Sequence, residues 1–358
     1  MTEQRLERIW CSLLQLQMVN PEESFFDLGG HSLLCLRLLA EMQREFQREL
    51  SIGDILQAPT LREMAVLLDR DAVAMDSPLV TLREAAAAGG APLFLVHPVG
   101  GSVACYAELA KHLDMAGAVF GLQSPLLTGS GGPQSLEEIA ALYVDEIRAV
   151  QPEGPYRLAG WSLGGMIAYE IARQLRSEGS AVNLLALIDS YPPSVVRQWA
   201  EQQLPVVAFA EDLLGGSLEG LDTTQPEGQV LEALSAKLQV DCAALFRVFR
   251  LHLDASRQYV PRAADISITL VEAGTPAADL AAEWGALALS GITVYRLSAS
   301  HYNILQSPQV QRVAEILTPH AISARAAAGA PAHAGWSDPQ TTPVLLPARS
   351  SNSDPIVH

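Results

Sequence analysis

Ser162 lies in the stretch Gly160-Trp161-Ser162-Leu163-Gly164, which fits the pattern G-x-S-x-G. Small residues on both sides of a serine permit a sharp turn from a strand into a helix, with the hydroxyl exposed at the turn. The apolar run YRLAG precedes this serine and an amphipathic run follows it, as such a turn requires. The stretch predicts a nucleophile for acyl transfer, whereas a helix-capping serine between structural glycines is the simpler alternative.

A nucleophilic serine needs a base, and the base needs an acid to orient it. Where the G-x-S-x-G turn carries such a triad, the chain order is serine, acid, histidine. Of the eight histidines, only His301 directly follows the last expected strand, in SASHYNIL, and we predict it as the base. Asp189 ends the apolar run VNLLALID and is the predicted acid, with Glu272, at the end of ISITLVEAG, as the alternative.

The acyl-transfer reaction also needs hydrogen-bond donors for the developing oxyanion, and backbone N–H groups suit this role because they are fixed in advance. Leu163, directly after the serine, is expected to supply one. The loop HPVGG, which follows the apolar run PLFLV, is expected to supply the other from Val99. Its two glycines let the backbone approach a substrate closely, although the loop could equally be only a tight turn.

A second serine, Ser32, lies in the sequence DLGGHSLL at the start of an expected helix. No base is evident near it in the sequence, so we do not predict a nucleophile there. The free N–H groups and the dipole at the start of a helix favour an attached phosphate. Ser32 is therefore either a modification site or an ordinary helix cap.

The hydrophobic pattern divides the chain into regions. Residues 1–73 carry apolar positions at helical spacing and predict a small α-helical bundle, and residues 74–91 are rich in Ala, Gly and Ser and predict a linker. Residues 92–320 alternate apolar strands with helices, which predicts a mostly parallel sheet covered by helices on both faces. Residues 193–262 interrupt this alternation with a helical insertion. Residues 321–358 are rich in Ala, Pro and Ser and are expected to be disordered.

The composition excludes several classes of function. Hydrophobic residues make up 49% of the 358 residues, enough for a sizeable core, but no run is long enough to predict a membrane span. The formal charge of −17 disfavours binding to nucleic acid. The four cysteines have neither metal-site spacing nor the density of a disulfide framework, and we expect no metal. A charged N-terminus without an apolar signal segment indicates the cytoplasm.

Two parts of the chain resemble known families. The segment FFDLGGHSLL resembles the phosphopantetheine attachment motif of peptidyl carrier domains in nonribosomal peptide synthetases, a match that extends over roughly residues 3–73. The resemblance implies that Ser32 carries 4′-phosphopantetheine, and His31 before it is typical of peptidyl carriers. Residues 92–320 resemble type I thioesterases in GWSLGG, LIDSYPP, FLVHPVGG and the late histidine. That resemblance implies an α/β-hydrolase fold in which residues 193–262 form a lid.

Together the resemblances imply the terminal carrier and thioesterase of a peptide or hybrid peptide/polyketide assembly line. The implied reaction releases a carrier-bound peptidyl or acyl thioester through an acyl-serine intermediate, by hydrolysis or macrocyclisation. The implied partners are upstream condensation and adenylation modules and a phosphopantetheinyl transferase, without nucleic acid or membrane. A stand-alone serine esterase with an unrelated helical N-terminus is the alternative, and a carrier module with an inactive hydrolase domain is a third interpretation.

Overall fold

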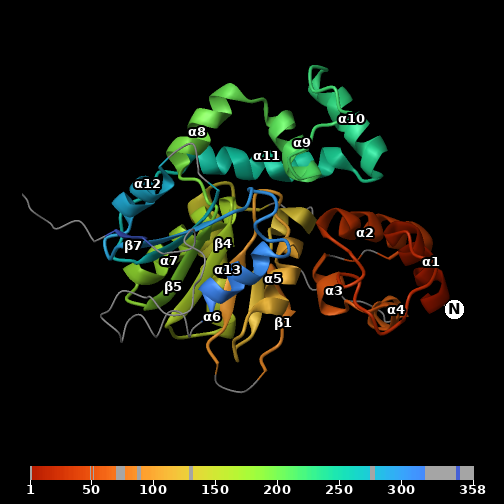
Figure 1. Cartoon of the computed structure of the whole chain (residues 1–358), viewed down its shortest axis with the longest axis horizontal. Helices are drawn as coiled ribbons and strands as arrows, with labels where there is room; N and C mark the ends of the chain where they lie inside the picture. The colour runs from red at the N-terminus through yellow and green to blue at the C-terminus, as the bar shows by residue number, and fades with distance from the viewer. Residues whose placement is uncertain are drawn as a thin grey trace, which may run out of the picture.

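The computed structural model describes residues 2–48, 50, 52–69, 77–86, 90–128, 132–274, 279–318 and 344–346. Its N-terminal part is a bundle of four helices, coloured red to orange in Figure 1: α1 (Thr2–Leu14), α2 (Ser32–Phe46), α3 (Ile52–Gln57) and α4 (Leu61–Asp69). Apolar positions at helical spacing bring Leu6 and Trp10 of α1 into its interior, where they are fully buried together with Phe25 from the turn before α2. The ring centroids of Trp10 and Phe25 are 5.0 Å apart in an edge-on arrangement. The predicted helical bundle is confirmed.

The rest of the described chain is built on one sheet of eight strands, in the order β1-β3-β2-β4-β5-β6-β7-β8. The pairs β1/β3 and β7/β8 are antiparallel, and all the other neighbours are parallel. The predicted, mostly parallel sheet is therefore confirmed. The strands are β1 (Leu79–Arg83), β2 (Leu93–Val96), β3 (Val119–Leu122), β4 (Tyr156–Trp161), β5 (Val182–Ile188), β6 (Ile268–Ala273), β7 (Ile292–Leu297) and β8 (Val344–Leu346).

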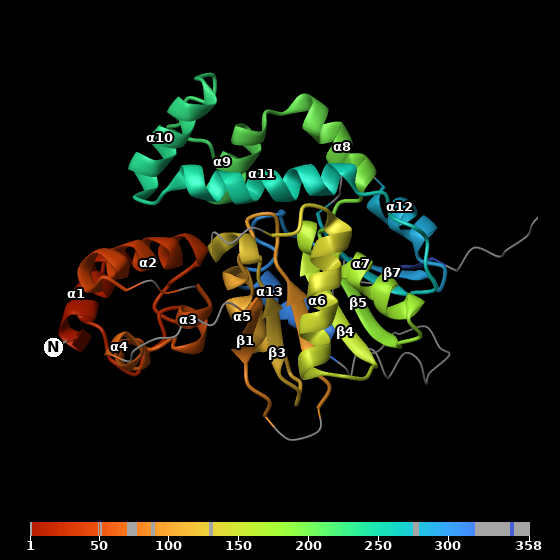
Figure 2. The same cartoon turned by 180° about the vertical axis from the view of Figure 1, so that it is seen from behind.

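Helices cover both faces of this sheet (Figures 1 and 2). Side chains on one face share an apolar core with α6, α7 and α12, and those on the other face share one with η1, α5 and α13. Successive strand residues point to opposite faces, so runs such as LFLV in β2 are apolar throughout and are buried on both sides. These helices are η1 (Ala104–Tyr106), α5 (Ala107–His112), α6 (Leu136–Val150), α7 (Leu163–Ser177), α12 (Leu280–Leu287) and α13 (Gln309–Leu317), and a short turn, η2 (Pro125–Thr128), precedes α6.

Four helices between β5 and β6 lie above the carboxyl ends of the strands, coloured green to teal in Figures 1 and 2. They have an apolar core of their own, which includes Phe209, Phe246 and Phe249. We call these four helices the lid: α8 (Pro193–Gln202), α9 (Pro205–Leu214), α10 (Glu227–Leu238) and α11 (Cys242–Gln258).

Two strands lie where the sequence predicts none. Within the expected linker, residues 74–91, strand β1 pairs with β3 at one edge of the sheet, because the apolar residues of SPLVTLR can cover that edge. Within the expected disordered tail, residues 321–358, the triplet Val344–Leu346 forms β8 against β7. An edge strand offers unpaired N–H and C=O groups that even a short apolar segment can satisfy. Each of these segments thus contains a strand that the sequence analysis did not predict, and the other tail residues lie outside the described part of the chain.

The helical bundle packs against both the sheet domain and the lid. Ile52 and Leu56 of α3 belong to the same apolar cluster as Val80 of β1. Leu33, in the first turn of α2, packs on the apolar core of the lid. The side chain of Arg37 donates a hydrogen bond to Gln239 at 3.1 Å. The first turn of α2 therefore lies at the boundary between the bundle and the lid (Figure 2). None of the described helices is long and apolar enough to span a membrane.

Candidate active site

Ser162 lies at the turn between β4 and α7, with φ 57° and ψ −127°. A side chain in this region of backbone space costs on the order of 1–3 kcal/mol, so the surrounding structure must enforce it. The glycines around it allow the close packing that does so. A Cβ on Gly160 would lie 2.1 Å from the backbone of Gly164, and a Cβ on Gly164 would lie 2.2 Å from the carbonyl oxygen of Val96. The N–H of Ser162 also donates to Ile188 O at 3.0 Å.

His301 lies in the loop between β7 and α13, as predicted from its position in the sequence. Its Nδ1 is 2.6 Å from Oδ2 of Asp189. A carboxylate can only accept hydrogen bonds, so Nδ1 carries the proton and Nε2 is left as the basic nitrogen. Aromatic rings surround the imidazole: the ring centroids of Trp161, Tyr302 and Tyr191 lie 5.0, 5.2 and 5.5 Å from that of His301.

Asp189 follows β5, with φ 42°, and the residue is 1% exposed. Besides His301 it accepts hydrogen bonds from the N–H of Ala273 to Oδ1 at 2.8 Å and from the hydroxyl of Tyr191 to Oδ2 at 3.4 Å. These donors satisfy a buried negative charge and hold the carboxylate in one orientation. The arrangement can therefore fix the tautomer of the imidazole and stabilise it when it becomes charged.

Glu272, the alternative acid, is also buried but has a different partner. Its Oε2 binds Nε of Arg296 at 2.8 Å, while Oε1 has no partner among the described residues. Burial raises the pKa of this carboxyl, against the opposing effect of Arg296. Of the two strand-end acids that the sequence offers, the structure thus brings Asp189, and not Glu272, to His301.

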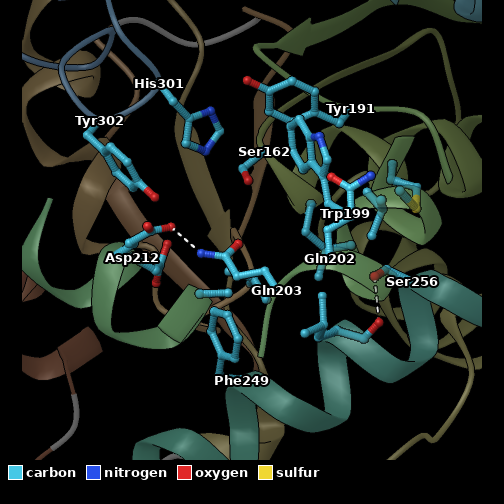
Figure 3. A pocket seen from close by; sticks show the side chains of 17 residues that line it. Ser162, Tyr191, Trp199, Gln202, Gln203, Asp212, Phe249, Ser256, His301 and Tyr302 are labelled. Atoms are coloured by element: carbon cyan, nitrogen blue, oxygen red, sulfur yellow. Dashed lines mark hydrogen bonds between the residues drawn. The ribbon is translucent and has the colours of Figure 1, made fainter. Parts of the chain in front are cut away.

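A cavity of about 440 Å³ opens beside the serine and contains both Ser162 and His301 in its lining (Figure 3). Val99 and Leu163, the predicted oxyanion donors, line the same cavity. Within the described part of the chain, neither of their amide N–H groups is used in another hydrogen bond. The geometry thus brings together a serine, a histidine–aspartate pair and two free donors. This is the combination that acyl transfer requires.

Residues of the lid complete this cavity, and the sequence analysis did not identify most of them as site residues. Trp199 of α8 and Asp212 of α9 line it, whereas the apolar Phe209 and Phe246 lie in the lid core. Burial raises the pKa of Asp212 to about 6, and the nearby His301 acts in the opposite direction. A single acidic residue in an insertion carries no sequence signal that distinguishes it from a solvent-exposed charge.

Ser32 is the first residue of α2, and the residue that caps the helix is His31, in an extended conformation with φ −140° and ψ 176°. His31 makes no side-chain capping hydrogen bond, so the simple interpretation of Ser32 as the helix cap does not hold. The N–H groups of the first turn of a helix bind phosphate favourably, and a serine at this position can carry one. The position of Ser32 thus fits a phosphopantetheine group. Among the described residues, no cluster of His, Cys, Asp or Glu is arranged to hold a metal ion.

Comparisons with known proteins give the same two parts. Residues 91–320 match the thioesterase domain family, and residues 4–68 match the phosphopantetheine attachment site family. The dimodular nonribosomal peptide synthase of Bacillus subtilis (strain 168) is 40% identical over 195 residues, which is 52% of this chain and 8% of that protein. Enterobactin synthase component F of Escherichia coli (strain K12) is 33% identical over 199 residues, which is 54% of this chain and 15% of that protein. The chain therefore spans only a small part of the length of these relatives.

Solved structures agree with the fold. The four-domain nonribosomal peptide synthetase holo-AB3403 matches 88% of this chain and 26% of its own, with a TM-score of 0.59 and 29% identity. The NocB thioesterase domain, in a covalent complex with a fluorophosphonate nocardicin G analogue, matches 68% of this chain and 96% of its own, with a TM-score of 0.51 and 27% identity. The chain thus belongs to the thioesterase domain family, with an α/β-hydrolase fold, and carries a phosphopantetheine attachment domain in front of it.

Proposed function

We propose that this chain releases a peptidyl or acyl group from its own carrier domain through an acyl-Ser162 intermediate. In this proposal residues 1–73 are the carrier, residues 92–320 are the thioesterase, and Ser32 is the attachment site. One observation carries the proposal: Leu33, next to Ser32, packs on the same lid that covers the cavity of Ser162 and His301. The attachment point and the nucleophile thus belong to adjoining parts of one molecule.

The phosphopantetheine group, when bound to Ser32, presents the acyl chain as a thioester. In the proposed reaction Ser162 Oγ attacks the thioester carbonyl while Nε2 of His301 takes its proton. The N–H groups of Val99 and Leu163 hold the oxyanion. The C–S bond breaks as the thiol leaves with the proton from His301, which restores the neutral imidazole.

A second nucleophile then releases the product from Ser162. His301 deprotonates either water, which gives an acid, or a hydroxyl or amine of the same acyl chain, which gives a ring. Asp189 supports both half-reactions by stabilising the imidazolium. Neither half-reaction consumes an oxidant or a further cofactor.

The proposal extends to the surroundings of the chain. The similarity to nonribosomal peptide synthetases supports upstream condensation and adenylation modules as the source of the acyl chain, and a phosphopantetheinyl transferase as the enzyme that modifies Ser32. The four cysteines are free thiols, which fits the reducing cytoplasm.

The test combines two labels on one protein. The chain is incubated with coenzyme A and a phosphopantetheinyl transferase, and intact mass is measured before and after. A fluorescent fluorophosphonate then reports whether Ser162 is reactive. We expect the mass of one phosphopantetheine group, lost in Ser32→Ala, and fluorophosphonate labelling, lost in Ser162→Ala.

Each outcome separates the proposal from an alternative. Fluorophosphonate labelling without any mass gain would favour a stand-alone esterase, and mass gain without labelling would favour an inert carrier module. Ser32→Ala should still hydrolyse a small soluble thioester nearly as fast as the unmodified wild type, because Ser32 lies in a separate helical bundle. Loading that persists in Ser32→Ala would refute the assigned attachment site.

A further inference from the structure

Two histidines near the active site have no part in the proposed reaction. His97 begins the HPVGG loop, and His252 lies on the lid helix α11, 1% exposed or less in both cases. Their ring centroids are 4.8 Å apart. Both rings are buried next to the loop that carries Val99, so they can act on that loop even though they do not line the cavity with Ser162.

Each imidazole donates its Nδ1 proton to one carbonyl of the loop. Nδ1 of His97 is 2.7 Å from the carbonyl oxygen of Pro98, and Nδ1 of His252 is 2.8 Å from that of Val99. A carbonyl oxygen can only accept, so both nitrogens carry protons. Nε2 of His252 is 3.0 Å from Oγ of Ser124, whose hydroxyl can donate to it. Nε2 of His97 has no partner among the described residues.

Burial keeps both rings neutral. It lowers the pKa of His97 to about 3 and that of His252 to about 4. A neutral imidazole has one N–H, and in both residues that N–H is used on the loop. The tautomer of His252 is further fixed because Ser124 occupies its other nitrogen.

These hydrogen bonds determine which way the loop amides face. In a trans peptide the C=O and the following N–H lie in one plane and point in opposite directions. The Pro98 carbonyl, held by His97 and by the N–H of Gly101 at 2.9 Å, therefore directs the N–H of Val99 away from His97. The Val99 carbonyl, held by His252, directs the N–H of Gly100 away from the lid helix in the same manner.

The packing leaves little room for another arrangement. Gly101 has φ +84°, and a Cβ there would lie 3.3 Å from Cε1 of His252 and 3.3 Å from Val248 of the same helix. The N–H of Ser124 also binds the carbonyl of Gly101 at 2.9 Å. The loop is thus packed closely against α11. Three of its carbonyl oxygens, those of Pro98, Val99 and Gly101, accept hydrogen bonds.

We infer that His252 is a positioning residue that fixes the oxyanion loop from the lid, and that His97 does the same from the sheet. The inference rests on the proposed acyl-serine reaction. Because His252 belongs to α11, the roof of the acyl cavity is mechanically connected to the loop that carries Val99, the proposed donor for the oxyanion. A displacement of α11 away from the loop would break the hydrogen bond to Val99 and release the loop amides from their orientation.

Two amide substitutions at residue 252 separate this role from simple packing. The side-chain nitrogen of asparagine is attached to Cγ, as Nδ1 is in histidine, and can still donate to Val99 O. The nitrogen of glutamine lies one atom further out, near the position of Nε2, and reaches Ser124 instead. We expect His252→Gln to lower kcat for a soluble N-acetylcysteamine thioester roughly tenfold to hundredfold, with little change in KM. His252→Asn should recover most of that loss.

A second substrate tests whether the loss concerns the oxyanion. In the matching dithioester, sulfur replaces the carbonyl oxygen and accepts hydrogen bonds only weakly, so its turnover depends less on the loop amides. The penalty of His252→Gln should therefore be several-fold smaller on the dithioester than on the thioester. His112→Gln, on the exposed surface of α5 near Glu108, is the control and should change neither rate.

The outcomes are distinct. Equal losses in the glutamine and asparagine variants, equal penalties on the two substrates, or a rise in KM alone would overturn the inference and leave a packing role. If His252→Gln melts below the assay temperature, the same pair of substitutions at His97 tests the neighbouring carbonyl. If Ser162→Ala turns over the thioester as fast as the wild type does, the proposed function itself fails. That result does not depend on the variants of residue 252.

Discussion

The chain contains two serines with proposed roles, each at the start of a fifteen-residue helix, and they differ in almost everything else. Ser32 is the first residue of α2 and follows a relaxed, extended His31. Ser162 precedes α7 with a φ of 57°, in a region that side chains normally avoid. Both benefit from the positive end of a helix dipole. The helix start alone therefore does not make a serine a nucleophile.

The difference lies in what surrounds each hydroxyl. Around Ser162 the fold supplies a base on one loop, an acid that orients it on another, and free amides from two further segments. It also places a partly buried carboxyl, Asp212, in the same cavity. Buried polar and charged groups such as these cost free energy unless they are paired. A serine that is modified by another enzyme needs only to be accessible at a well-formed helix.

The largest expected effect is on turnover after loss of Ser162 or its base. Ser162→Ala should lower kcat on the carrier-bound substrate by about 10⁶-fold, and His301→Ala should do nearly the same, because triad members act as a unit. Acyl chain should accumulate on Ser32 and be visible by intact mass. Near-normal turnover in His301→Ala would mean that another group serves as the base.

The next largest effect distinguishes the two strand-end acids. Asp189→Asn should lower kcat by about 10⁴-fold, because asparagine favours the wrong tautomer of His301 and cannot stabilise the imidazolium. Glu272→Gln should have a mild effect, because its partner is Arg296. Rates are compared at one pH with folding checked by thermal melting. If Glu272→Gln caused the larger loss, the assignments of Ser162 and His301 would stand, and Glu272 would replace Asp189 as the assigned acid.

The contrast in backbone strain predicts opposite changes in stability. Ser162→Gly removes the Cβ that makes φ 57° unfavourable, and we expect a gain of about 1 kcal/mol after the entropy of glycine in the unfolded chain is subtracted. Ser32→Gly places glycine in a helix and should cost a few tenths of a kcal/mol. Scanning calorimetry of both variants measures whether each is more or less stable than the wild type. A loss of stability in Ser162→Gly would show that the turn is not strained by its side chain.

The smallest effect is a pH-dependent change in stability at Asp212. Burial raises the pKa of this carboxyl to about 6 in the folded protein, above its value in the unfolded chain. Folding therefore disfavours its ionised form, and the wild type loses stability as the pH rises from about 4 through 6. Asp212→Asn should melt with the wild type near pH 4 and at a higher temperature above pH 7. If the melting temperature of Asp212→Asn exceeded that of the wild type by the same amount at every pH, ionisation of Asp212 would not be the cause.

The sequence indicates which strand-end residues lie at this site better than it indicates which lid residues cover it. Ser162, Asp189 and His301 were identifiable because each lies at a strand end or beside a sharp turn, where hydrophobic periodicity stops. His252, which contacts the loop, and Asp212, which lines the cavity, were not identifiable, since both lie on amphipathic helices where a polar residue ordinarily faces water. Their roles depend on how the lid packs over the loop, and that arrangement has no local pattern in the sequence.

The limits of the fold prediction have a similar origin. Helices and central strands follow from periodic apolar runs, and the fold class was correct. Strand β1 was missed because its five residues lie next to a stretch rich in Ala and Gly that follows them, and β8 because it has only three residues. A short edge strand is stabilised by the neighbour that it pairs with, so its own sequence indicates little.

Besides the apolar packing of Ile52 and Leu56 on Val80, the carrier makes polar, partly exposed contacts with the rest of the chain. Lys111 and Asp27 form an ion pair at 2.5 Å near the surface, and Arg37 donates one hydrogen bond to Gln239. Such contacts are individually worth well under about 1 kcal/mol. They can be this weak because both partners belong to one polypeptide, which gives an effective concentration on the order of millimolar for flexibly joined modules. In the proposed reaction, delivery of the acyl chain from Ser32 to Ser162 is then an intramolecular step, which does not require tight polar contacts between the carrier and the lid.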